Sequence, residues 1–224
     1  MHFLVSVLVD VKSGKTLEEL LAPYQENNMG DCPRKYLEFN ECSIEEIEEY
    51  EKYKDDYKNL DEFMYEYYGY KKDDKTGKYG YWENPNAKWD WYAIGGRWSN
   101  SLLTKSGVRC NSAKLKDIDW VKLTQIKKKE AEELWDNTVN NPNSFSHWIT
   151  INNTRENYIE SESQFSTYAV ITPDGEWHSE DGVGLFGVSS DNAENSDSWS
   201  KGFYDTFIKN MDDELMLVIV DCHV

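Results

Sequence analysis

The chain has 224 residues, with 42 acidic and 24 basic side chains and a formal net charge of −18 at pH 7. An aromatic content of 14 % excludes a generically disordered chain. The longest apolar runs, at residues 3–9 and 215–220, are far shorter than the roughly 20 residues of a membrane helix. No secretory signal is visible either, so we expect a cytoplasmic protein without a membrane partner.

The N-terminal third begins with a strand. Residues 1–9 are β-branched and almost continuously apolar, which predicts a strand buried on both faces. Thr16 can then cap a short helix. The four residues from Ser43 to Glu46 fit a capping box, which opens an acidic, tyrosine-rich helical stretch from about Ile44 to Tyr68. A polar loop follows at residues 69–80.

The remaining elements follow from the same periodicities and from turn residues. Thr172-Pro-Asp-Gly175 suits a type I turn, so the segments on either side of it are predicted to pair as a hairpin. The other predicted elements are a helix that Asp117 or Asp119 caps and that ends near residue 137, a short strand at 148–151, strands at 165–171 and 176–178, a glycine-rich stretch at 182–187, a polar loop at 191–198, a helix at 199–211 and a strand at 215–220.

The two most apolar strands lie at opposite ends of the chain, and neither can be buried alone. Pairing them in one sheet is the economical arrangement. The sequence therefore predicts an α+β fold with a single mixed or antiparallel sheet. The N-terminal and C-terminal strands would be central in that sheet, with helices packed on it, and residues 1–224 would form one domain.

Charge is distributed unevenly along the chain. Residues 38–66 hold twelve acidic and three basic side chains, a net charge of −9. Residues 173–224 hold twelve acidic and two basic side chains, a net charge of −10. Residues 88–129, in contrast, hold three acidic and ten basic side chains, a net charge of +7. A basic segment between acidic flanks is typical of an anion site in an acidic protein, although Lys122 and Lys127–Lys129 are more simply the solvated face of a helix. The overall field disfavours duplex nucleic acid as a partner.

The cysteines Cys32, Cys42, Cys110 and Cys222 show no C-x-x-C spacing. We interpret them as reduced thiols that pack as small hydrophobic side chains. A zinc site that combines Cys222, His223 and a distant cysteine is the alternative. The sequence implies no resident metal or cofactor.

The segment from Trp82 to Trp98 is the most unusual part of the sequence, because five of its seventeen residues are Trp or Tyr. A strand over Lys88–Ile94 would alternate aromatic side chains between its faces, and exposed rings could stack on a nucleobase. Gly95-Gly96 permits close approach of backbone N–H groups to a ligand, and Arg97 suits a phosphate or carboxylate. The predicted ligand-binding residues are Lys88, Trp89, Trp91, Tyr92, Gly95, Gly96, Arg97 and Trp98.

A purely structural interpretation of this segment is equally open. The tryptophans would then be core residues, the glycines a turn or bulge, and Arg97 a partner for Asp90 or another carboxylate. No phosphate-loop pattern is present.

Residues 84–98 resemble a family of uncharacterised proteins from bacterial genomes, prophages and phages that carry the stretch Asn-Pro-x-x-Lys-Trp-Asp-Trp-Tyr-x-Ile-Gly-Gly-Arg-Trp. The resemblance extends to weaker blocks at Leu20–Tyr24, Thr172–Trp177 and Gly184–Gly187, and to the terminal Asp-Cys-His at 221–223. It implies a phage or mobile-element origin and a location in the bacterial host cytoplasm, and it brings no catalytic residues. It also marks the acidic helical and loop region at about 38–80 as a variable insertion.

Three side chains are candidates for catalysis. Asp221 and His223 lie two residues apart on a predicted strand and therefore on the same face, where they could form an orienting carboxylate–imidazole pair. His178, on another strand, could join them around a metal ion. Against this, the chain has no nucleophile elbow and no H-E-x-x-H motif, which favours a non-catalytic protein.

Three functions follow from these observations. The first is a phage or mobile-element protein that binds a small anionic, nucleotide-like ligand, in its most concrete form an anti-defence sponge for an immune nucleotide signal. The second is an acidic inhibitor that mimics nucleic acid and binds a host defence protein. The third is a metal-dependent hydrolase built on His178, Asp221 and His223. The sequence does not indicate the oligomeric state.

Overall fold

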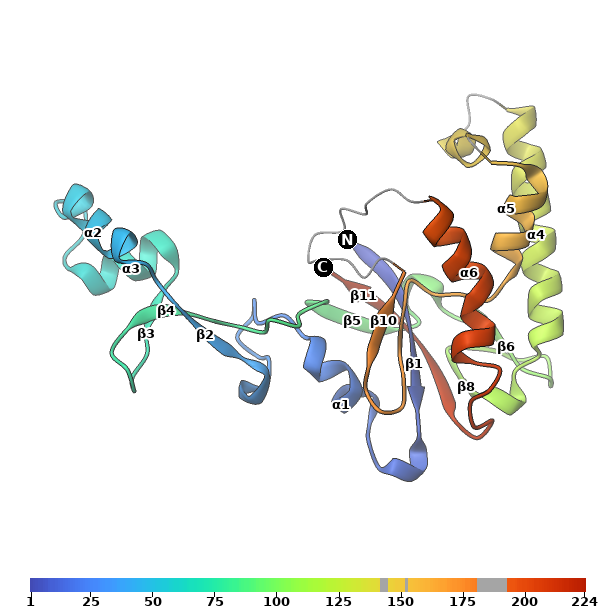
Figure 1. Cartoon of the computed structure of the whole chain (residues 1–224), viewed down its shortest axis with the longest axis horizontal. Coiled ribbons are helices and arrows are strands. Elements are labelled where there is room, and N and C mark those ends of the chain that lie inside the picture. The colour runs from blue at the N-terminus through green and yellow to red at the C-terminus, as the bar shows by residue number, and fades with distance from the viewer. Residues whose placement is uncertain (142–144, 152, 181–192) are drawn as a thin grey trace. The chain divides into compact units, whose positions relative to one another are not determined.

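The computed structural model describes residues 1–141, 145–151, 153–180 and 193–224 (Figure 1). The chain divides into two compact units. The first unit comprises Met1–Leu21 and Trp91–Val224, and the second unit comprises Ala22–Asp90. The proposed insertion at about 38–80 lies within the second unit, and a single domain over residues 1–224 stays a prediction. The glycine-rich stretch at 182–187 lies outside the described residues.

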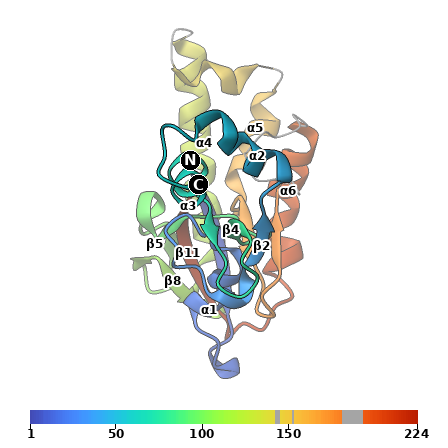
Figure 2. The same cartoon turned by 90° about the vertical axis from the view of Figure 1, so that its left-hand side faces the viewer.

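The first unit is built on a mixed six-stranded sheet in which β1 (His2–Val9) and β11 (Met216–His223) are central, which confirms the predicted fold class. β1 and β11 pair antiparallel over their full length, from His2 opposite His223 to Val9 opposite Met216. The two ends of the described chain therefore lie side by side (Figure 2). The other strands of this sheet are β5 (Trp91–Ile94), β8 (Ser112–Lys114), β9 (Ala169–Ile171) and β10 (Trp177–Ser179).

The order of the strands decides which side chains can meet. The sheet runs β10-β9-β1-β11-β5, and β8 pairs with β11 beside β5. β9 is parallel to β1, whereas β10, β11, β5 and β8 each pair antiparallel with their neighbours. Residues at the start of β1 therefore lie beside residues at the end of β11 and the start of β5.

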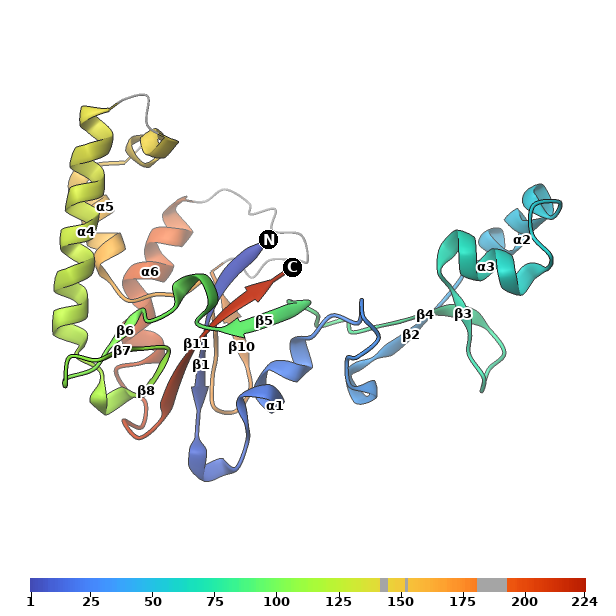
Figure 3. The same ribbon diagram turned by 180° about the vertical axis from the view of Figure 1, so that it is seen from behind.

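Helices cover both faces of this sheet. α4 (Trp120–Asn140) and α6 (Ala193–Phe207) pack on one face, with α5 (Arg155–Ser163) against both of them, and α1 (Leu17–Leu21) lies on the other side (Figure 1, Figure 3). Side chains alternate between the faces of a strand, so Leu8 and Ile219 reach the same core as Phe203 of α6. The hairpin of β6 (Leu102–Leu103) and β7 (Arg109–Cys110) adds two leucines to this core.

Several local signals are confirmed. The backbone N–H of Glu19 donates to Thr16 Oγ1 at 3.2 Å, so Thr16 caps α1. Of the two candidate caps for α4, Asp119 is the one that acts, because its Oδ1 accepts from Lys122 N at 3.0 Å. The predicted hairpin forms, with Gly175 N donating to the carbonyl of Thr172 at 2.9 Å. None of the described helices is long and apolar enough to cross a membrane.

The second unit is a small sheet carrying two helices. Its strands are ordered β2 (Glu38–Glu41), β4 (Tyr79–Glu83) and β3 (Lys71–Lys72), and the Ser43–Glu46 capping box opens α2 (Ile44–Tyr53). The predicted helical stretch over 44–68 consists of two helices, because α3 (Leu60–Tyr68) starts anew at its cap Asn59. The break lets tyrosines from both helices surround Phe63, which is fully buried.

Two predictions of secondary structure are wrong. Residues 148–151 do not form a strand, because Phe145–Thr150 forms a 3₁₀ helix in which Ile149 packs with Trp135 of α4. The predicted polar loop at 191–198 is already helical from Ala193, and α6 ends at Phe207 rather than near residue 211. At residues 145–150 the contact of Ile149 with α4 outweighs the strand propensity of this apolar run.

Candidate functional site

The Trp-rich segment is divided between the two units. Lys88 and Trp89 belong to the second unit, where the backbone N–H of Lys88 donates to the Tyr24 carbonyl at 2.7 Å and Trp89 is only 4 % exposed. Trp98 belongs to the first unit and packs, partly buried, against its core. Two of the three predicted stacking tryptophans are therefore packing residues.

The other aromatic residues of the segment lie on β5. Trp91 is 46 % exposed and lies opposite His223 of β11. Tyr92 lies opposite Cys222, and burial, followed by the charge of Glu18, raises the pKa of its phenol. Because neighbouring residues of a strand point to opposite faces, Trp91 and Tyr92 do not face one ligand together.

The two glycines make room for protein side chains. Gly95 has φ +76° and Gly96 has φ +47°, a region that side chains with a Cβ rarely adopt. A Cβ on Gly95 would lie 2.5 Å from Cγ of Asn111, and a Cβ on Gly96 would lie 2.7 Å from Cγ of Asp221. The pair therefore brings this bend of the chain against two side chains of the first unit.

Asp221 is the centre of the arrangement. It is only 2 % exposed, its Oδ2 accepts the backbone N–H of Arg97 at 2.9 Å, and its Oδ1 lies 2.8 Å from Nδ1 of His2. Burial by itself raises the pKa of a carboxyl group. Here the hydrogen bonds from Arg97 and His2, together with nearby positive charge, outweigh burial and hold the pKa of Asp221 below its ordinary value.

The hydrogen bond to Asp221 decides the tautomer of His2. An ionised carboxylate can only accept, so we assign the proton of the neutral imidazole to Nδ1. Nε2 then carries a lone pair, and no residue that the structure describes donates to it. The side chain of His2 is 17 % exposed, so part of the imidazole is open to solvent.

Three rings meet beside this pair. The rings of His223 and Trp91 are stacked, with centroids 5.3 Å apart and an interplanar angle of 17°. The edge of His2 meets both of them, at 4.9 Å from His223 and 5.2 Å from Trp91. We call a group of five residues the terminal cluster: His2, Trp91, Asp221 and His223 from one end of the sheet, and Arg97 from the 3₁₀ helix Gly96–Trp98 that follows β5.

The predicted catalytic group does not assemble. His178 lies on β10, where its ring packs against Phe207 at 5.2 Å, and two strands separate it from β11. Asp221 and His223 both lie at the end of β11, but the hydrogen bond of the Asp221 carboxylate goes to His2 and not to His223. No three His, Cys, Asp or Glu side chains in the described part of the chain are grouped so that they could hold a metal ion.

His2 is the residue that the sequence analysis missed. A signal for it was present, because the two end strands were predicted to pair and each carries a histidine at its outer end. An antiparallel register that sets His2 opposite His223 also places Asp221 only two residues further along the neighbouring strand, on the same face as His2.

Most of the basic segment is engaged elsewhere. Lys114 and Lys116 both pair with Glu214, and their hydrogen bonds lower the pKa of that carboxyl to about 2. Lys127 donates to the Gln164 carbonyl at 2.7 Å, and burial lowers its pKa, so it does not belong to the predicted solvated face. Arg97 differs from these lysines, because its exposed guanidinium forms no ion pair with any described residue.

The cysteines carry no reactive signature. The described thiols are free, and burial raises the pKa of Cys32, Cys42 and Cys222. A raised pKa leaves little thiolate at neutral pH, which is typical of packing cysteines.

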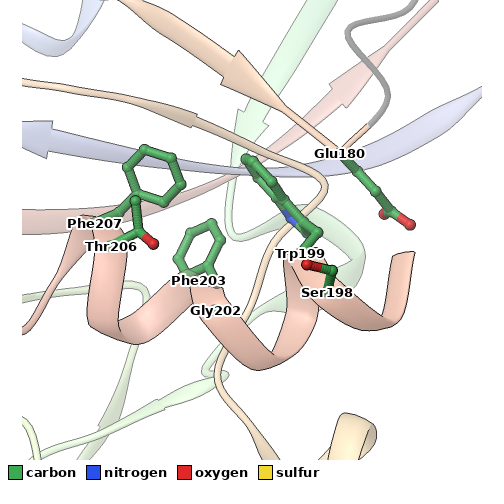
Figure 4. Close-up of a pocket in the computed structure, with 7 residues that line it drawn as sticks. All are labelled: Glu180, Ser198, Trp199, Gly202, Phe203, Thr206 and Phe207. Atoms are coloured by element: carbon green, nitrogen blue, oxygen red, sulfur yellow. The ribbon is translucent and has the colours of Figure 1, made fainter. Parts of the chain in front are cut away.

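A cavity of about 320 Å³ lies on α6 (Figure 4). Three aromatic rings form its wall, and Trp199 is fixed there by a hydrogen bond from Nε1 to the Thr167 carbonyl at 2.8 Å. Among the described residues that line it, the one charged side chain is the carboxylate of Glu180, which disfavours an anionic ligand. The residues that line it are Glu180, Ser198, Trp199, Gly202, Phe203, Thr206 and Phe207.

No protein-family model, curated protein or solved structure matches this chain. The class of protein is therefore defined by geometry alone, as an α+β protein with a carboxylate-centred cluster at the paired ends of its two central strands. The resemblance carried by residues 84–98 stays a prediction.

Proposed function

We propose that this protein binds a small anionic, nucleotide-type ligand at the terminal cluster. One observation carries the proposal: an exposed aromatic ring and an exposed guanidinium are both tied to the buried carboxylate of Asp221. Arg97 is tied through its backbone N–H, and Trp91 through its ring contacts with His2 and His223. A guanidinium binds phosphate through two parallel hydrogen bonds, and an indole face stacks on any base.

The rigidity of the backbone around Arg97 supports this role. Trp98 N donates to Gly95 O at 2.8 Å, and Gly95 N donates to Ile219 O at 2.8 Å, so the bend is fixed on β11. A side chain that leaves a fixed backbone loses less conformational freedom when it binds an anion. Lys88 and Trp89 are left out of this site, because they belong to the second unit.

The net charge of −18 limits the size of the ligand. Fields of separate surface charges are screened within about 8 Å at physiological ionic strength, so a local guanidinium can hold a small anion. A long polyanion would also meet the acidic surfaces, which disfavours duplex nucleic acid. In a phage or mobile-element setting, tight binding without turnover would make the protein a sponge for a nucleotide signal.

The experiment is calorimetric titration of the purified protein with linear and cyclic nucleotides and ADP-ribose, after a thermal-shift screen. W91A is expected to weaken binding about 5- to 150-fold, which corresponds to about 1–3 kcal/mol per stacked base. R97A is expected to weaken it about 10- to 150-fold, from about 1.5–3 kcal/mol for hydrogen bonds to a charged group.

Matched variants control for loss of an exposed ring or charge. Trp148 is 65 % exposed and Arg109 is exposed, both lie in the first unit away from the terminal cluster, and W148A and R109A are expected to bind like the wild type. If folded W91A and R97A keep full affinity, or if none of these compounds binds, the proposal is wrong.

The acidic inhibitor is a second candidate, because α2 presents carboxylates without a partner inside the described chain. Glu45 and Glu48 are exposed and form no ion pair there, whereas Glu46 and Glu49 accept hydrogen bonds from Tyr70 and Tyr68. The double charge reversal E45K/E48K should therefore abolish inhibition of a host enzyme without disturbing the fold. Inhibition that survives it would remove this candidate.

A further inference from the structure

We propose that His2 is a general base and that the terminal cluster hydrolyses a phosphoanhydride bond of the nucleotide bound there. This inference rests on the proposed function, because it uses the same site and the same class of ligand. It adds a reaction, a catalytic residue and a positioning residue to that function.

Asp221 orients the imidazole of His2. The buried carboxylate of Asp221 holds Nδ1 of His2 at 2.8 Å, which places the lone pair on Nε2. An imidazole oriented in this way by a carboxylate is the arrangement that hydrolases use to take a proton from an attacking group. Nε2 has no hydrogen-bond partner among the described residues and the His2 side chain is 17 % exposed, and we place the attacking water molecule at this nitrogen.

The imidazole of His2 is fixed on more than one side. The Asp221 carboxylate is itself fixed by the N–H of Arg97 at 2.9 Å. The ring of His2 lies edge-on to the rings of Trp91 and His223, at centroid distances of 5.2 and 4.9 Å. A base that is held in one plane before the substrate arrives needs no rearrangement during the reaction.

The chemistry of the leaving group favours a phosphoanhydride as the bond that breaks. The cluster offers one oriented base and one exposed guanidinium, on Arg97. Cleavage of a phosphoanhydride suits this pair, because the leaving group is a phosphate that departs as an anion. Such a leaving group needs its charge neutralised, which a guanidinium does, and it does not need a proton.

A water molecule is the nucleophile of the proposed reaction. The oxygen of a water molecule forms a new bond to phosphorus while Nε2 of His2 takes one proton from that water. The bond from the same phosphorus to the bridging oxygen breaks, and the electron pair leaves with the departing phosphate beside Arg97. The second proton of the water stays on the new phosphate, and His2 then releases its proton to solvent.

The experiment incubates the full chain with ADP, ATP and ADP-ribose in water enriched in ¹⁸O and follows the products by chromatography and mass spectrometry. Turnover with one ¹⁸O in a product phosphate is expected. General-base catalysis contributes about 10²–10⁴-fold, so H2Q should lower the rate at least 100-fold while calorimetry shows that the nucleotide still binds. H147Q, which replaces an exposed histidine of the same unit, should react like the wild type.

Asp221 is a positioning residue and needs a different readout. D221N keeps the shape of the side chain, but its amide no longer favours the tautomer with the proton on Nδ1. We expect kcat to fall with KM little changed, and the pH dependence of kcat to change its form. This variant also covers the case in which H2Q does not fold.

The outcomes separate the two proposals. A nucleotide that binds with dependence on Trp91 and Arg97 and is recovered intact overturns the hydrolysis and leaves the binding site standing. Turnover at the wild-type rate in H2Q and D221N overturns the role of His2. If no nucleotide binds, the proposed function fails first and the hydrolysis fails with it.

Discussion

Replacement of Gly96 by alanine tests the central contact of the terminal cluster. The residue has φ +47°, and a Cβ there would lie 2.7 Å from Cγ of Asp221. Two costs follow. The left-handed backbone costs a residue with a Cβ about 1–2 kcal/mol. The carboxylate must also move, and each hydrogen bond that a buried group loses costs about 1–3 kcal/mol.

Asp221 makes two such hydrogen bonds, to Arg97 N and His2 Nδ1, and is 2 % exposed. If the shift breaks one of them, G96A loses about 3 kcal/mol of unfolding free energy in total. Gly14 supplies a matched control in the same unit. It has φ +76°, but no atom of the described residues lies within 4 Å of a Cβ built there, so G14A should lose only the backbone cost of about 1–2 kcal/mol.

The assay is urea denaturation followed by far-ultraviolet circular dichroism and tryptophan fluorescence. With a slope of about 2 kcal/mol per M urea, a difference of about 1–2 kcal/mol between the variants separates their midpoints by about 0.5–1 M. Equal midpoints for G96A and G14A would refute the close approach of Gly96 to Asp221. A wild-type midpoint for G96A would refute the left-handed backbone as well.

Two predictions concern pH. The pKa of Asp221 lies below its ordinary value of 3.8, so its stabilising contribution is present above that pH and is lost as the pH falls through the lower, folded value. The stability difference between wild type and D221N should therefore shrink below about pH 3.8 in denaturation curves, and a constant difference would contradict the lowered pKa. Carbon-13 NMR should show Glu214 titrating with a pKa of about 2, because Lys116 and Lys114 donate hydrogen bonds to its carboxylate. K116A should move this pKa back toward 4.5. A pKa near 4.5 in the wild type would contradict these ion pairs.

The sequence by itself determined the elements whose causes are local. A capping residue, a turn and an apolar run act within a few positions, which is why the Ser43 cap, the Thr172–Gly175 turn and the end strands are where the sequence predicts them. The pairing of the end strands also followed, because two fully apolar strands can be buried only against each other and their neighbours.

Some sequence patterns are compatible with more than one structure. The sequence predicts a helical stretch over residues 44–68, and the cap at Asn59 and the packing around Phe63 divide it into two helices. Tryptophan content likewise could not separate a ligand-facing ring from a packing ring. Trp89 and Trp98 are drawn into the packing of two different units, and Trp91 is left exposed on β5.

The site itself was decided only by the tertiary structure. His2 and Asp221 are 219 positions apart in sequence, and their hydrogen bond depends on the register of β1 against β11. The close approach of Gly96 depends on β5 pairing with the other edge of β11. Register is a property of two strands together, since a slip of one residue turns every side chain to the opposite face. The sequence therefore shows which chemical groups the chain carries, whereas the register of the strands determines which of these groups contact one another.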